Sequence, residues 1–131
     1  MYELHAWFGL AETASEGDVG GLGSAVDALQ PILARFVPPQ AIAEVRSLNG
    51  DYFLWVNGMQ NRPRDLEGAI EDLLGALAER LPGSWGIVYD RSDEWFDRSL
   101  ANAFRVRVLA RGNVSVREDT FLSPVRPTIE D

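Results

Sequence analysis

Apolar residues recur at every second position in several segments of the chain, which is the spacing of a β-strand with one buried face. In residues 2–10 the apolar face carries Tyr2, Leu4, Ala6, Phe8 and Leu10. Residues 85–90 and 104–111 are also predicted to be strands, and Gly112-Asn113 is predicted to turn the second of these into a strand over residues 114–117.

Asn49-Gly50 is the clearest local signal in the chain, because both residues tolerate the positive φ angles of a type I′ turn. The pair separates two apolar-rich runs, residues 42–48 and 51–57. A two-residue loop fixes the register of the resulting hairpin, so that Val45 faces Leu54 and Glu44 faces Trp55.

Two other segments repeat apolar residues every three or four positions, as an amphipathic helix does. The first spans residues 22–36 and contains Pro31, which is expected to kink or break the helix because proline has no backbone N–H. The second begins at Pro63 and ends before Pro82-Gly83.

The predicted elements follow the order β-α-β-β-α-β-β and indicate the α+β class. One mainly antiparallel sheet with both amphipathic helices on one face buries the two helical stripes at once. A ferredoxin-like split β-α-β arrangement with an added hairpin is the simplest such topology. The length of 131 residues suits a single domain over residues 1–131, and Pro124 and Pro127 predict an extended tail over residues 118–131.

The composition excludes several kinds of chemistry. All 12 basic residues are arginine, against 20 acidic residues, and the net charge is -8. Without lysine there is no Schiff base and no phosphate-binding lysine of a P-loop. The chain has no cysteine and one histidine, which excludes a thiol nucleophile, a thiolate metal site and a two-histidine metal centre within one chain.

The charge and hydropathy patterns also bear on partners and location. No part of the chain is strongly basic, so nucleic acid is not an expected ligand. The longest early apolar run, residues 6–11, is too short for a signal peptide or a membrane span, and we expect a cytoplasmic protein with no membrane contact. The acid excess has two interpretations, solubility and a basic partner surface.

Four acidic residues, Asp90, Asp93, Glu94 and Asp97, lie at and after the end of the predicted strand over residues 85–90. A solvated loop is the first interpretation, a partner-facing acidic patch the second, and a calcium or magnesium site the third. The spacing does not match an EF-hand, which disfavours the metal site.

Aromatic residues gather on the sheet face that the helices are not expected to cover. That face is predicted to carry His5, Trp7, Phe53 and Trp55, and we expect Arg105 and Arg107 to join it on a neighbouring strand. Such a mixture is typical of binding hot spots. The alternative is that the tail, with Phe121 and Leu122, folds back and buries the rings.

His5 and Glu3 share a strand face at a spacing that a general base and its partner could use. No nucleophile can be assigned beside them. A structural role for this single histidine is therefore the favoured interpretation.

Four stretches of the chain resemble the immunity protein 7 family of bacterial polymorphic toxin systems. They are the opening MYELHAWF, the closing FLSPVRPTIED, residues 85–94 (WGIVYDRSDE) and the strand that begins at Phe104. Two positions depart from the family pattern: glycine is common where Ala6 stands, and cysteine is common where Val125 stands. The resemblance implies an α+β protein that binds and neutralises a cognate toxin domain, without catalytic residues.

These observations lead to one functional hypothesis. We expect a non-enzymatic immunity protein without a cofactor, which occludes a toxin domain by non-covalent binding; a basic toxin such as a nuclease is the favoured partner. The predicted contact residues are Trp7, Trp55, Asp90, Asp93, Glu94 and Asp97. The alternatives are a small acidic interaction module and a metal-dependent hydrolase that uses the carboxylates of residues 90–97. The sequence does not indicate the oligomeric state.

Overall fold

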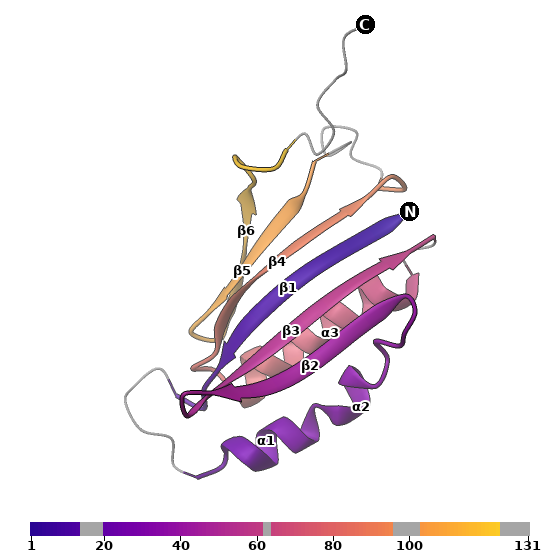
Figure 1. The fold of residues 1–131 in the computed structure, drawn as a ribbon. Helices are drawn as coiled ribbons and strands as arrows, with labels where there is room; N and C mark the ends of the chain where they lie inside the picture. The colour runs from indigo at the N-terminus through magenta and orange to yellow at the C-terminus, as the bar shows by residue number, and fades with distance from the viewer. Residues whose placement is uncertain (14–19, 62–63, 96–102, 124–131) are drawn as a thin grey trace, which may run out of the picture.

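The computed structural model describes residues 1–13, 20–61, 64–95 and 103–123. Within these residues the chain is α+β, with six strands and three helices (Figure 1). The strands are β1 (Tyr2–Leu10), β2 (Ala41–Leu48), β3 (Asp51–Gln60), β4 (Trp85–Ser92), β5 (Arg105–Ala110) and β6 (Asn113–Glu118). The helices are α1 (Leu22–Ala28), α2 (Gln30–Leu33) and α3 (Arg64–Arg80).

The strands form one open sheet in the order β2-β3-β1-β4-β5-β6, and every neighbouring pair is antiparallel. The first four strands, with helices connecting β1 to β2 and β3 to β4, have the split β-α-β order of a ferredoxin-like unit. The β5-β6 hairpin then extends the sheet beyond β4. The predicted fold class is confirmed.

The hairpin between β2 and β3 has the predicted turn. Asn49 and Gly50 both have positive φ, 53° and 87°, as a type I′ turn requires. Val45 pairs with Leu54 and Glu44 with Trp55, so the register predicted from the turn is confirmed.

The first predicted helix is divided near its proline. α1 ends at Ala28, α2 begins at Gln30, and Pro31 lies in the first turn of α2. Because Pro31 has no N–H to donate to the carbonyl of Asp27, the helical hydrogen-bond ladder is interrupted there. The predicted break is confirmed.

The turn between β5 and β6 lies one residue earlier than predicted. Arg111 and Gly112 occupy its two central positions, with φ of 52° and 74°, and Asn113 already pairs with Ala110. The prediction of Gly112-Asn113 was wrong because glycine occupies the second position of this turn, as Gly50 does in the other hairpin.

The core lies between the helices and one face of the sheet (Figure 1). The strands contribute the inward-facing residues Tyr2, Leu4, Phe8, Leu54, Val56 and Val88. The helical layer contributes the apolar stripes Leu29, Leu33, Leu66, Ile70, Leu73 and Leu77. The alternation of apolar and outward-facing residues along β1 therefore distinguishes the core face of the sheet from the face that the helices leave uncovered.

The described residues include no helix that is both long and apolar enough to cross a membrane.

Candidate functional site: the uncovered face of the sheet

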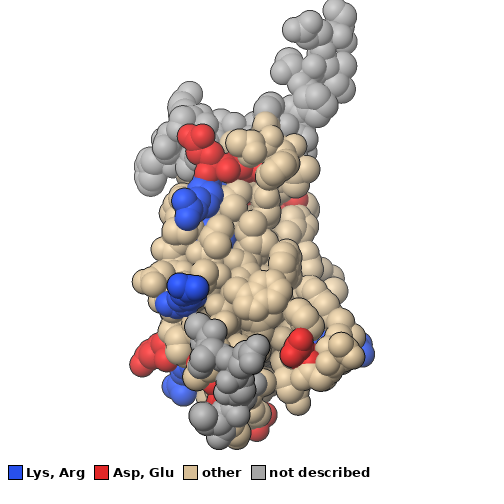
Figure 2. All heavy atoms as spheres, turned by 90° about the vertical axis from the view of Figure 1, so that its left-hand side faces the viewer, with Lys and Arg blue, Asp and Glu red and all other residues tan. Residues whose placement is uncertain are grey.

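The sheet face opposite the helices, here called the open face, is rich in aromatic side chains. The outward positions of β1, β3 and β4 carry Trp7, Phe53, Trp55, Trp85 and Tyr89. Figure 2 shows the side of the molecule that lies to the left in Figure 1: uncharged residues fill most of its centre, and charged side chains lie mainly toward its margins. The open face is therefore a candidate surface for contact with another protein.

Four of these rings form a continuous series across three strands, which we call the aromatic row: Trp7, Phe53, Trp55 and Trp85. Phe53 and Trp55 are stacked, with centroids 6.3 Å apart and planes 14° from parallel. Trp85 meets Phe53 edge-on at 6.4 Å and Trp7 at 5.4 Å. Trp7 is 44% and Trp85 47% exposed, so the row combines mutual support with accessible ring surface.

Gly9 makes this arrangement possible. In the register of the sheet Gly9 lies between Phe53 on β3 and Trp85 on β4. A Cβ atom at Gly9 would come within 2.5 Å of Cε2 of Trp85. The missing side chain thus lets the indole of Trp85 lie across β1 and reach Phe53. Trp85 was not among the predicted site residues; a glycine at an outward position of β1 was the signal that could have indicated it.

Phe121 and Leu122, the two tail residues that were considered as a cover for the aromatic rings, do not cover the aromatic row. Phe121 is 85% and Leu122 56% exposed, and their backbone N–H groups donate to the carboxylate of Asp119. Glu118, where we placed the start of the tail, is still paired in β6, and residues 124–131 lie outside the described residues.

A polar group lies beyond the aromatic row toward the start of β1. Glu3 accepts hydrogen bonds from the guanidinium of Arg91 at 2.8 and 3.0 Å, and its other oxygen lies 2.8 Å from Nε2 of His5. Nδ1 of His5 lies 2.8 Å from the side-chain oxygen of Asn57. Both ring nitrogens of His5 therefore have partners, which supports the structural interpretation of this histidine.

The pKa of Glu3 is sensitive to this setting. Burial tends to raise the pKa of Glu3, but the hydrogen bonds with His5 and Arg91 outweigh burial and hold the pKa below the ordinary value of 4.5. A carboxyl group with a lowered pKa in the folded state stabilises the fold above its unfolded pKa. That contribution is lost as the pH falls through the folded pKa.

We therefore expect Glu3→Gln to lower the free energy of unfolding by about 1–2 kcal/mol at neutral pH. The difference from the wild type should narrow as the pH falls below the ordinary pKa of 4.5, because the wild-type carboxyl then becomes protonated. Urea unfolding at neutral and acidic pH measures both values. The control Glu44→Gln, which removes the exposed pair with Arg46, should change stability by less than about 0.5 kcal/mol. An equal effect of Glu3→Gln at both pH values would contradict the assignment.

Two predicted acidic contact residues are exposed at the end of β4. Asp93 accepts a hydrogen bond from the Met1 amino group at 2.6 Å, and this bond lowers the pKa of Asp93. Glu94 is the next residue in the turn, and its backbone N–H donates to Ser92. Asp97 lies outside the described residues.

Asp90 is placed differently from its neighbours, because β4 continues to Ser92 and turns Asp90 toward the helices. Asp90 has no exposed surface. Its carboxylate accepts hydrogen bonds from the hydroxyl of Tyr2 at 2.6 Å, from Arg105 at 2.6 and 2.9 Å, and from Arg107 at 3.0 Å. Asp90 thus joins β1, β4 and β5 from within the molecule.

Arg105 and Arg107 lie on the helix side of the sheet, so their predicted position on the open face was wrong. Arg105 pairs with Asp90 across β4 and β5, and cross-strand partners share a face. From α3, Glu71 pairs with Arg107, and Glu67 lies 3.6 Å from Arg105. Together with Tyr2, these residues form what we call the charge cluster: Tyr2, Glu67, Glu71, Asp90, Arg105 and Arg107.

Protonation within the charge cluster follows from its burial. Burial raises the pKa of the Tyr2 phenol far above its ordinary range, and the adjacent Asp90 carboxylate raises it further. Tyr2 therefore keeps its proton and donates a hydrogen bond to the Asp90 carboxylate. Because this carboxylate is shared by Tyr2 and two arginines, it is not free to ligate a metal ion. No group of three acidic, histidine or cysteine side chains suited to a metal ion occurs among the described residues.

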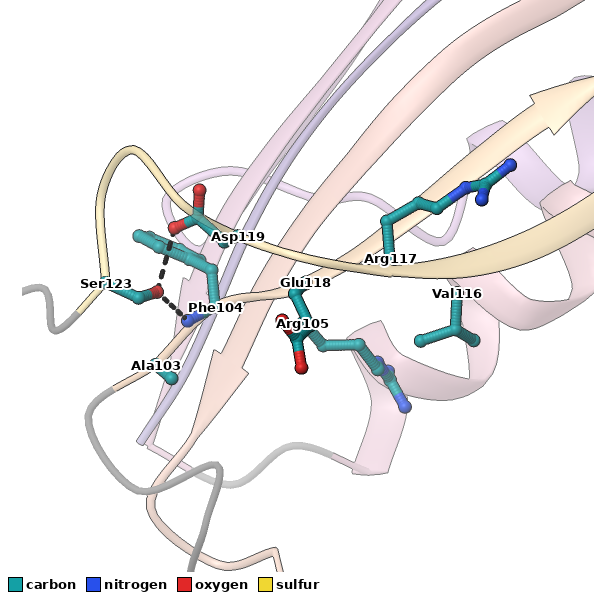
Figure 3. A pocket seen from close by; sticks show the side chains of 8 residues that line it. All are labelled: Ala103, Phe104, Arg105, Val116, Arg117, Glu118, Asp119 and Ser123. Atoms are coloured by element: carbon teal, nitrogen blue, oxygen red, sulfur yellow. Dashed lines mark hydrogen bonds between the residues drawn. The ribbon is translucent and has the colours of Figure 1, made fainter.

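A pocket of about 450 Å³ lies where β5 and β6 meet the segment before Ser123 (Figure 3). Ser123 Oγ accepts a hydrogen bond from the N–H of Phe104 and donates one to Asp119, both at 2.8 Å. The charged lining residues are Arg105, Arg117, Glu118 and Asp119. Because two of these side chains are positive and two are negative, the lining favours neither an anionic nor a cationic ligand.

Comparison with known protein families adds an independent observation. The model described as immunity protein 7 matches residues 1–131, the whole of the chain. The chain belongs to the immunity protein 7 family. Immunity proteins of this kind act against toxins, and the family is not catalytic in general. The resemblance to this family that four stretches of the sequence indicated is thus confirmed. Comparisons with curated proteins and with solved structures found no match.

Proposed function

We propose that the chain binds a cognate toxin domain non-covalently through the open face and thereby occludes the toxin's active site or an adjacent surface. Family membership supports a toxin as the partner. The aromatic row is the observation that supports the open face as the binding surface, because its four rings contact one another on the side of the sheet without helices. We further propose that this binding takes place in the cytoplasm.

The aromatic row has the properties of an interface centre. Tryptophan dominates the binding energy of many interfaces because it buries a large rigid surface at little cost in conformational entropy. Trp7 and Trp55 project from neighbouring strands and pair directly in the sheet register. Ring contacts hold these side chains before the partner arrives, which reduces the entropy lost on binding.

Asp93 and Glu94 extend the proposed contact along β4, at the opposite end of the strand from Trp85. Exposed carboxylates at the rim of an interface accelerate association with a basic partner, such as a nuclease domain. Asp97 stays a predicted contact outside the described residues, and the buried Asp90 is not part of the proposed surface. An association rate that does not change with salt would contradict a basic partner.

We expect Trp7→Ala and Trp55→Ala each to weaken binding of the toxin domain encoded beside this gene by about 30-fold, or about 2 kcal/mol. Isothermal titration calorimetry measures the affinity, and survival on co-expression with the toxin measures neutralisation. Val116→Ala is the matched control, since Val116 is an exposed apolar residue on β6 that faces the helix side. If the wild type binds and both tryptophan variants retain its affinity within about twofold, the open face is not the toxin-binding surface.

A further inference from the structure

A small pocket of about 130 Å³ lies at the end of β1, beside the aromatic row. The pocket is lined by Gly9, Leu10, Ala11, Asp51, Tyr52, Phe53 and Trp85. Pockets for small-molecule ligands usually measure about 300–1,000 Å³. The size of this pocket therefore suits one side chain of a partner better than a whole metabolite.

Asp51 gives the pocket a negative charge that no described residue compensates. Strands β1 to β4 carry four carboxylates, and three of them pair with an arginine: Glu3 with Arg91, Glu44 with Arg46 and Asp90 with Arg105. Among the described residues, the carboxylate of Asp51 has neither an ion pair nor a hydrogen bond. Asp51 is exposed as the first residue of β3, two positions before Phe53 and on the same face.

The rings beside Asp51 attract the same kind of group. Phe53 and Trp85 meet edge-on at 6.4 Å, so one ring presents a face toward the edge of the other. Aromatic faces attract ammonium and guanidinium groups, and the apolar stem of a lysine or arginine packs well against rings. A carboxylate next to such rings adds a charge-assisted hydrogen bond. These features together select a cationic side chain over an apolar or an acidic one.

We propose that this pocket receives the charged end of a single lysine or arginine side chain that projects from the toxin domain. This inference rests on the proposed function, because the toxin supplies the side chain. It makes the pocket a specificity element at one end of the aromatic row. The rings of the row then contribute buried apolar surface, and Asp51 selects a partner with a basic residue at the matching position.

The first experiment measures affinity for the toxin domain encoded beside the gene. Asp51→Asn should weaken binding at least tenfold, and this loss should shrink at high salt because the lost contact is electrostatic. Asp65→Asn is the matched control, because Asp65 is an exposed carboxylate on α3 in the helical layer; its effect should stay within about twofold.

The second experiment tests the pocket without the toxin. The indole N–H of Trp85, assigned with Trp85→Phe, is followed by NMR while butylguanidinium is added to the millimolar range. Neutral butylurea, which has nearly the same shape, is the matched compound. We expect a shift with butylguanidinium alone, and a smaller one in Asp51→Asn.

The two experiments separate the two proposals. If the wild type binds the toxin, but Asp51→Asn binds equally well and butylguanidinium leaves Trp85 unshifted, the pocket proposal is overturned and the proposed function stands. If the toxin is not bound but Trp85 responds to butylguanidinium alone, the preference of the pocket for a cation stands, and the proposed function fails together with the toxin as the source of the side chain. An equal response to both compounds rejects the role of charge.

Discussion

Asp90→Asn is expected to lower the free energy of unfolding by about 3–5 kcal/mol, one of the two largest effects anticipated for a single substitution in this protein. The carboxylate of Asp90 is fully buried and accepts hydrogen bonds from Tyr2, Arg105 and Arg107. An amide at this position keeps the shape but removes the negative charge. The two guanidinium groups would then lie partly or fully buried without their shared counterion.

Chemical denaturation at neutral pH measures this loss. Asp93→Asn makes the same chemical change three residues later, where the side chain is exposed, and should lower the free energy of unfolding far less than Asp90→Asn does. A loss below about 1 kcal/mol for Asp90→Asn would show that Glu67 and Glu71 suffice to neutralise the arginines. Asp90 would then not be their main counterion.

Phe8→Ala is expected to destabilise the fold by a similar amount, about 3–5 kcal/mol, because it removes a fully buried ring and leaves a cavity. Its neighbour Trp7 points to the open face and is 44% exposed. Trp7→Ala should therefore cost only about 1–1.5 kcal/mol of stability, chiefly through its lost contact with Trp85.

Comparing these two adjacent variants separates effects on stability from effects on toxin binding. Phe8→Ala should unfold more easily yet retain toxin affinity wherever it is still folded, and Trp7→Ala should have the opposite profile. Thermal unfolding and calorimetric titration at a temperature where both variants are folded provide the two measurements. Equal stability losses for Phe8→Ala and Trp7→Ala would contradict the assignment of opposite roles to the two faces of β1.

Local signals sufficed to predict much of the fold. The alternation in residues 2–10 matched β1, and Asn49-Gly50 set both the turn and the register of the β2-β3 hairpin. Pro31 predicted the break between α1 and α2 because the missing N–H acts within one helical turn. Each of these features depends on residues close together in the sequence.

The features that sequence reasoning missed depend on residues far apart. Arg105 and Arg107 alternate with apolar residues, so the pattern alone favoured turning the arginines outward. Their inward position depends on Asp90 from β4 and on Glu67 and Glu71 from α3, and no local pattern indicates that these groups meet. Trp85 similarly joins the aromatic row only because Gly9, on another strand, has no side chain.

If the toxin binds the open face as proposed, the division of β1 into two faces affects how toxin specificity can change over time. Even-numbered residues of β1 are packed against the helices, and odd-numbered ones such as Trp7 face outward. Neighbouring residues of β1 are therefore under different selection: the inward ones must fill a fixed volume in the core, and the outward ones must complement the surface of the toxin. A lineage can exchange outward residues to follow a diverging toxin while the scaffold keeps its packing, so new recognition need not be accompanied by a new fold.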